Sequence, residues 1–192
     1  MHFEKSELNH PPLKNTTTPV PLRSWEPFLV IDSKKHAQAP RSIQSIEGIG
    51  DRLRAAAFAE IQAREAFLWA SENFTDIPPT LKHDWQTLAK EEDKHMNWLL
   101  NRLADLKQNV KARAVSTRLW ESFIACETAE RFAQFMASAE ERGRQAGERF
   151  YENLKEIDPI SAAIFKQIAL EEISHIELAR KYFPTETPSD SI

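Results

Sequence analysis

The sequence of 192 residues has little cysteine and little glycine, and each shortage excludes a class of site. Its single cysteine, Cys126, excludes an intrachain disulfide framework and a zinc cluster built from cysteines. Only four glycines occur, so we do not expect a glycine-rich phosphate-binding loop. No apolar run approaches the roughly 20 residues of a membrane span, and the N-terminus lacks the apolar core of a signal peptide. These absences predict a cytoplasmic protein with no membrane partner.

A strong excess of charge of one sign is also absent. The formal net charge is −4, and 28% of the residues are charged against 41% hydrophobic, as in ordinary globular proteins. Scattered basic residues such as Lys34, Lys35 and Arg41 fall short of a clear patch. We therefore do not expect a nucleic-acid partner, although tRNA stays open as a substrate.

Proline divides the chain into regions. Six of the eleven prolines lie in the first 45 residues, where they disfavour helix. We predict an extended arm over residues 1–45, a helical bundle over 46–184 and a disordered tail over 185–192. The aromatic and aliphatic residues of the arm would anchor it to the bundle, with a disordered arm as the alternative; these residues are Trp25, Phe28, Leu29, Val30 and Ile31.

The rest of the sequence is rich in strong helix formers and shows no convincing strand alternation. Helices are predicted over 51–74, 79–107, 117–153 and 159–182, with a loop over 109–116. The third stretch also fits two helices broken near Cys126 to Thr128. The prediction is an all-α bundle with four main helices.

The sequence contains an internal repeat. Shifted by 80 positions, residues 60–95 lie over 140–175 with 11 identities in 36 positions. Among the identical pairs are Glu60 and Glu140, Glu92 and Glu172, and His95 and His175. We interpret the repeat as two copies of one helical hairpin.

Each copy carries the motif Glu-x-x-His in its second helix. The spacing places Glu92 with His95, and Glu172 with His175, on one face of a helix. In each copy the first-helix glutamate, Glu60 or Glu140, precedes the motif glutamate by 32 residues. In antiparallel hairpins, four carboxylates and two imidazoles would therefore meet at one point.

This set matches the dinuclear carboxylate metal sites of helix bundles. Four buried carboxylates would repel one another without cations, and two divalent ions balance their charge. Oxygen and imidazole ligands suit iron, with manganese as an alternative metal. We predict that the metal ligands are Glu60, Glu92, His95, Glu140, Glu172 and His175.

Neighbouring glutamates compete for these roles. Glu141 adjoins Glu140 but pairs with Ile61 in the repeat, so we prefer Glu140 and leave the choice open. Glu91 and Glu171 point about 100° away from the motif glutamates that follow them, which predicts a surface or supporting place. Arg144 would pair with a supporting carboxylate or lie in solvent.

At these residues the chain resembles the ferritin-like superfamily of di-iron carboxylate proteins. It looks closest to the bacterial ferritin-like family named domain of unknown function four-five-five over about residues 40–182. The resemblance rests on Ser45-Ile46-Glu47-Gly48, Glu60-Ile61-Gln62-Ala63, Leu119-Trp120, Glu140-Glu141-Arg142-Gly143 and Glu171-Glu172-Ile173-Ser174-His175. It implies a ferritin-like four-helix bundle and supports the six ligands.

A more distant similarity is to the tRNA isopentenyl-adenosine hydroxylases, through Glu130-Arg131-Phe132-Ala133. Matching that phrase puts Ala125 where those enzymes carry a ligand glutamate. The expected function is therefore an O₂-activating di-iron oxidoreductase, of hydroxylase or oxidase type, with an unidentified organic substrate or electron donor. The alternatives are an iron-handling ferroxidase and a bundle that keeps metal for stability. A homodimer is compatible with either function.

Overall fold

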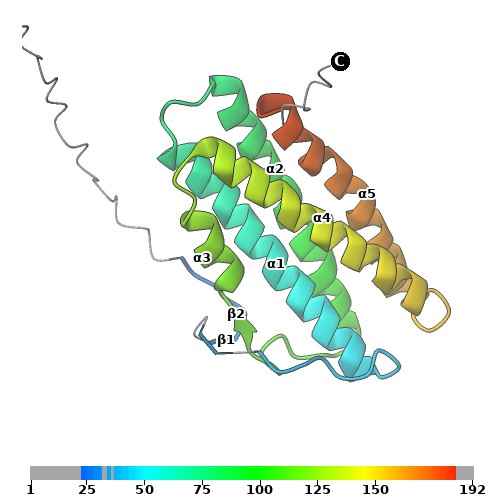
Figure 1. The fold of residues 1–192 in the computed structure, drawn as a ribbon. Coiled ribbons are helices and arrows are strands. Elements are labelled where there is room, and N and C mark those ends of the chain that lie inside the picture. The colour runs from blue at the N-terminus through cyan, green and yellow to red at the C-terminus, as the bar shows by residue number, and fades with distance from the viewer. Residues whose placement is uncertain (1–22, 32–33, 36, 185–192) are drawn as a thin grey trace, which may run out of the picture.

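The computed structural model describes residues 23–31, 34–35 and 37–184, and the secondary structure of this part is helical apart from two short strands (Figure 1). Its elements, in order, are β1 (Val30–Ile31), α1 (Ile46–Asn73), α2 (Pro79–Asp105), β2 (Val115–Ser116), α3 (Arg118–Ile124), α4 (Ala129–Leu154) and α5 (Pro159–Tyr182). The all-α prediction is confirmed. The predicted tail and the first 22 residues of the predicted arm lie outside the described residues.

Local capping sets where the helices begin. α1 starts at Ile46, ahead of the predicted residue 51, because the side chain of Ser45 accepts a hydrogen bond from the backbone N–H of Gly48. Thr128 caps α4 and Asp158 caps α5 in the same way. α2 ends at Asp105, short of the predicted residue 107.

The stretch predicted as one or two helices over 117–153 is two helices. α3 ends at Ile124 and α4 begins at Ala129, so the break falls at the predicted place near Cys126. Phe123 of α3 and Cys126, which follows this helix, are both buried in the same hydrophobic cluster. The short α3 is therefore held against the longer helices.

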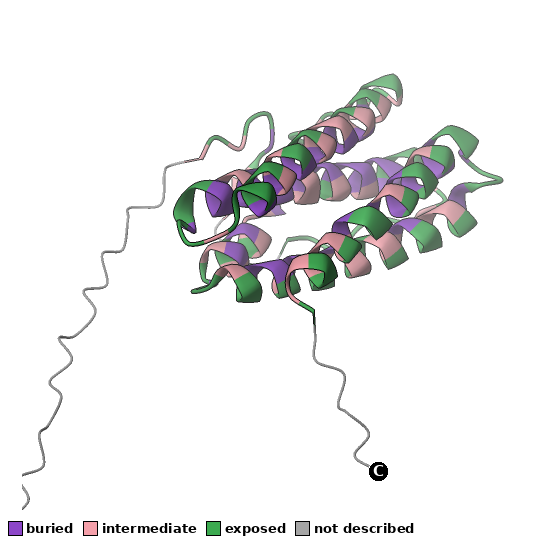
Figure 2. Cartoon of the chain, turned by 90° about the horizontal axis from the view of Figure 1, so that it is seen from above, coloured by how far each residue is buried: buried purple, intermediate pink, exposed green. Residues whose placement is uncertain are grey.

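The four long helices pack chiefly in two pairs, α1 with α2 and α4 with α5. Contacts between α2 and α5 and between α1 and α4 join the pairs, and α3 packs on α1 and α4. Figure 2 shows the buried faces of the helices turned toward one another, with exposed residues outside. Among the described residues, no helix is both long enough and apolar enough to cross a membrane.

Two hydrophobic clusters fill the interior, which we name the Phe132 cluster and the Leu53 cluster after a fully buried member of each. On α2 the Phe132 cluster extends to Ala89 and the Leu53 cluster resumes at Met96. The buried polar residues of α2 therefore lie in a layer between the two clusters.

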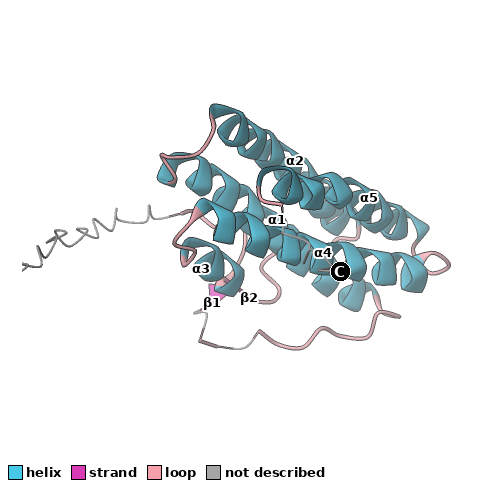
Figure 3. Cartoon of the chain, turned by 45° about the horizontal axis from the view of Figure 1, so that its top comes forward, coloured by secondary structure: helices cyan, strands magenta, loops and turns pink. Residues whose placement is uncertain are grey.

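The segment before α1 is partly tied to the helices. β1 pairs in parallel with β2, which corrects the prediction of no strands; strands of two residues are too short to show alternation (Figure 3). Phe28 is buried and the Trp25 ring lies 5.7 Å from those of Phe58 and Trp120, so these anchors are confirmed. Leu29 is wrong as an anchor, because it is 48% exposed.

Candidate metal centre

The structure brings all six predicted ligands together in the layer between the two clusters. They come from four helices: Glu60 from α1, Glu92 and His95 from α2, Glu140 from α4, and Glu172 and His175 from α5. Two groups could each hold a metal ion, with ligand atoms within 4.8 Å of one another. One group adds Glu60 and His95 to Glu92 and Glu172, and the other adds Glu140 and His175 to the same two glutamates. Glu92 and Glu172 thus belong to both groups.

Both histidines turn the Nδ1 atom toward the shared glutamates. Nδ1 of His175 lies 2.9 Å from Oε1 of Glu92 and 3.0 Å from Oε2 of Glu172. Nδ1 of His95 lies 3.4 Å from Oε1 of Glu172 and 3.7 Å from Oε2 of Glu92. The two imidazole rings are 5.9 Å apart and nearly parallel, so the two groups face each other across a short distance.

Several ligand atoms are buried without a hydrogen bond. They are both carboxylate oxygens of Glu92, Oε1 of Glu140, Oε2 of Glu172 and Nδ1 of both histidines. A buried polar atom without a hydrogen bond is costly, and each of these oxygen and nitrogen atoms can give an electron pair to a divalent metal ion. The donor set therefore fits two metal ions.

The electrostatics show how strongly the layer needs positive charge. Burial raises the pKa of Glu60 and Glu140 well above the ordinary value, and repulsion from Glu92 and Glu172 adds to the effect. Burial also acts to raise the pKa of Glu92, but contacts with His175 and His95 outweigh it and lower that pKa to about 2. Metal ions bound there would take the place of the protons that these raised pKa values favour.

Two further glutamates orient the histidines. Nε2 of His95 lies 2.7 Å from Oε2 of Glu171, and Nε2 of His175 lies 2.8 Å from Oε2 of Glu91. Each histidine on α2 or α5 is thus held by a glutamate of the opposite helix. A carboxylate at Nε2 accepts its proton and leaves the Nδ1 lone pair for a metal.

The sequence left open whether Glu91 and Glu171 lie on the surface or support the ligands. In the structure they support the ligand histidines. Their sequence signal is the repeat itself, because the two glutamates are identical at equivalent positions of the two copies. Lys94 also binds Glu171, with Nζ 2.6 Å from Oε2.

The competing glutamates bind arginines instead. Glu141 pairs with Arg144, whose Nε lies 2.8 Å from its Oε2, whereas Glu140 is buried in the layer. Glu65 pairs with Arg64 and with Arg23 of the N-terminal segment. Of Glu140 and Glu141, the residue that the repeat favours, Glu140, is the one that joins a ligand group.

A cavity of about 460 Å³ adjoins the layer. Three of the candidate ligands, Glu60, Glu140 and Glu172, are part of its wall, which is otherwise largely apolar. This volume is in the range of small-molecule sites. An apolar pocket beside the metals is expected of an oxidoreductase with an organic substrate, although the sequence does not say which residues form its wall.

The chain matches a known protein family. A family model described as "Protein of unknown function (DUF455)" matches residues 2–189. The chain belongs to this family. Comparisons of this DUF455 chain with curated proteins and with solved structures find no match.

Proposed function

We propose that this DUF455 chain is a ferritin-like four-helix bundle of two repeated hairpins that holds two iron ions, with manganese as the alternative metal. We further propose that it is an O₂-activating oxidoreductase of hydroxylase or oxidase type. The observation that carries the proposal is the sharing of Glu92 and Glu172 between two groups of potential ligands. An arrangement of two groups joined by carboxylates is typical of dinuclear sites in helix bundles.

In this proposal each ion has one glutamate and one histidine of its own. Glu60 and His95 would hold one ion, Glu140 and His175 the other, and the two shared glutamates both. Four carboxylates would balance two divalent cations, which removes the repulsion within the layer. When bound, such a pair of ions supplies Lewis-acid and redox chemistry toward O₂.

The protein itself supplies orientation and access. Glu91 and Glu171 hold the imidazoles of His175 and His95 in place through Nε2. The cavity would bring an organic molecule to Glu60, Glu140 and Glu172 along a largely apolar wall. The cavity is the observation that favours an organic substrate over the alternative, an iron-handling ferroxidase.

The test is metal content combined with O₂ consumption. The protein would be loaded anaerobically with Fe(II), desalted, analysed for metal and then exposed to O₂. We expect two irons per chain in the wild type and a loss of stoichiometric iron in the double variant His95→Ala/His175→Ala. His83→Ala is the matched control, because His83 is exposed and lies outside both ligand groups.

The outcomes separate the candidates. Two irons retained in the double variant would refute the ligand assignment. Iron binding without O₂ consumption would refute the oxidoreductase and leave a bundle that keeps metal for stability. Oxidation of iron beyond two ions per chain, followed by its accumulation as ferric mineral, would favour the ferroxidase.

A further inference from the structure

We propose that the cavity beside the ligand layer binds a carboxylic acid with a saturated hydrocarbon chain. The carboxylate would lie at an arginine-lined end and the chain would extend toward Glu60 and Glu140. Binding itself is argued from the cavity alone, whereas the role of the acid as substrate rests on the proposed function.

The two ends of the cavity differ in charge and are separated along the helices. Arg52 and Glu60 are eight residues apart on α1, which is about 12 Å at a rise of roughly 1.5 Å per residue. The guanidinium of Arg52 lies over the ring of Phe150, 6.0 Å from its centroid, while Glu140 lies ten residues earlier on the antiparallel α4. Arginine and Phe150 therefore mark one end, and the glutamates mark the other.

The arginine end has more positive charge than the protein neutralises. Arg52, Arg54 and Arg113 are part of the cavity wall there, and Asp51 is the one carboxylate of the wall at that end. Asp51 is already shared, since it also pairs with Arg41 outside the wall, at 2.7 Å. Glu47 is a further acidic neighbour of Arg41, so the excess that remains is about two positive charges.

Arg52 is the best placed of these residues to bind an anion. Its Nη1 donates to the backbone carbonyls of Arg41 and Gly48, and within the described residues no carboxylate is paired with it. Arg54 and Arg113, in contrast, both bind Asp51. Because a guanidinium binds a carboxylate through two parallel hydrogen bonds, a carboxylate ligand matches the free edge of Arg52.

Between the two ends, α1 and α4 line the cavity with small apolar side chains. They are Ala55, Ala56 and Ala59 of α1, and Gly143, Ala146 and Gly147 of α4. No charged side chain of the wall belongs to this middle part, so an unbranched hydrocarbon fits it better than a polar molecule. The N-terminal segment covers the arginine end with Ala37, Gln38 and Pro40.

The test is calorimetric titration of the metal-free full-length protein with decanoate, decan-1-ol and acetate. We expect one decanoate per chain, decanol at least tenfold weaker and no binding of acetate. Arg52→Gln should weaken decanoate about tenfold and leave decanol unchanged. Arg131→Gln is the matched control, because Arg131 is exposed on the same helix as Phe150 but outside the cavity wall.

A second pair of variants tests the hydrocarbon part. Ala146→Leu should fill the cavity and weaken decanoate and decanol alike by at least tenfold. Ala163→Leu, at an exposed helical position outside the wall, should bind both ligands as the wild type does. Thermal unfolding of each variant would verify that it is folded.

Equal affinity for decanoate and decanol, or an unchanged affinity in Arg52→Gln, would overturn the arginine site. Decanoate that binds only after metal loading, and is lost in Glu140→Gln, would overturn the proposed orientation. A protein that takes up two irons but binds neither ligand would refute this inference alone and leave the proposed function standing.

Discussion

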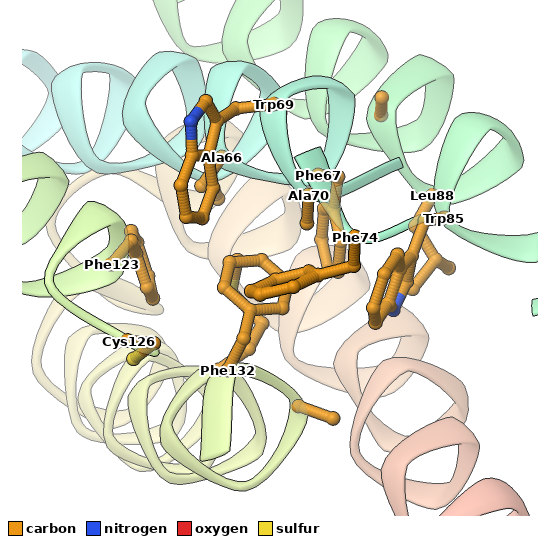
Figure 4. Packing of buried hydrophobic residues seen from close by; sticks show 14 of the residues in the cluster. Ala66, Phe67, Trp69, Ala70, Phe74, Trp85, Leu88, Phe123, Cys126 and Phe132 are labelled. Atoms are coloured by element: carbon orange, nitrogen blue, oxygen red, sulfur yellow. The ribbon is translucent and has the colours of Figure 1, made fainter. Parts of the chain in front are cut away.

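The two sides of the ligand layer are built in opposite ways. On one side the Phe132 ring has five aromatic neighbours with centroids 5.2 to 6.2 Å away (Figure 4). The space beside this cluster measures about 10 Å³. On the other side lies the cavity of about 460 Å³. One side is filled by rings, whereas the other holds both the Leu53 cluster and an open cavity.

The repeat contains one position at which the two sides differ. The shift of 80 positions places Phe67, a ring of the Phe132 cluster, over Gly147, which is part of the cavity wall. The same position thus carries a large side chain on the packed side and none on the open side. The comparison teaches that the ligand positions of two repeats can stay symmetric while the flanking residues differ. On one side these residues stabilise the fold by packing, and on the other they leave space for a ligand.

The largest expected effect is on the packed side. Phe132→Ala should lower the free energy of unfolding by about 3–5 kcal/mol, because it removes a fully buried ring and leaves a void. Chemical denaturation would measure the change. Phe150→Ala is the matched substitution on the open side, where the ring is only half-buried and already borders the cavity. Equal losses in the two variants would contradict the comparison.

Metal binding should stabilise the protein, because it removes the repulsion among the buried carboxylates of the ligand layer. At a free metal concentration 100 times the Kd, the free energy of unfolding should rise by about 2.7 kcal/mol for each ion bound. Thermal unfolding during an anaerobic Mn(II) titration would measure it. Glu141→Gln should respond as the wild type does and Glu140→Gln should respond less. A melting temperature independent of metal in the wild type would count against the centre.

The wall of the open side should depend on ion pairs more than on packing. Burial acts to raise the pKa of Asp51, but hydrogen bonds from Arg41 and Arg54 outweigh it and hold that pKa below the ordinary 3.8. Asp51→Asn should therefore cost about 2 kcal/mol at neutral pH, since Arg54 would stay buried without its carboxylate.

The pH dependence of this ion pair follows from the lowered pKa. Its contribution is fully present above pH 3.8 and is lost as the pH falls below that value. Denaturation at pH 7 and at pH 3 should thus show a smaller difference between wild type and Asp51→Asn at the lower pH. A difference that grows on acidification would show that Asp51 has a different role.

The smallest effect is expected at a glycine of the open side. A Cβ at Gly143 would have no neighbour within 4 Å, so Gly143→Ala should stabilise α4 by about 1 kcal/mol through helix propensity. Gly147→Ala is the contrasting variant, because its Cβ would lie 3.0 Å from the carbonyl oxygen of Phe165. Denaturation curves should move in opposite directions, and a shift of both in one direction would be inconsistent with this difference in space.

The sequence was most informative where the repeat and the helical period agree. The Glu-x-x-His spacing and the equal separations from Glu60 and Glu140 were enough to predict which six side chains meet. The start of α1 was misplaced because the weight of helix formers hid the cap at Ser45. The strands were missed because two residues cannot show a period.

The residues of the cavity wall could not be predicted in this way, because they follow no regular spacing in the sequence. Alanines such as Ala59 and Ala146 are common in helices, and only the packing of α1 against α4 decides whether they face a neighbour or a space. The cross-helix role of Glu91 and Glu171 likewise depends on how α2 lies against α5. The sequence predicts what a helix face carries more readily than what lies opposite.

The exchange of glutamates between α2 and α5 has a mechanical consequence. Two side-chain contacts join the antiparallel helices α2 and α5, one between His95 and Glu171 and one between His175 and Glu91. A shift of one helix along the other by a single residue, roughly 1.5 Å, would distort both contacts at once. The alignment of the two helices therefore determines the orientation of both imidazoles, so that a shift would disturb both ligand groups together.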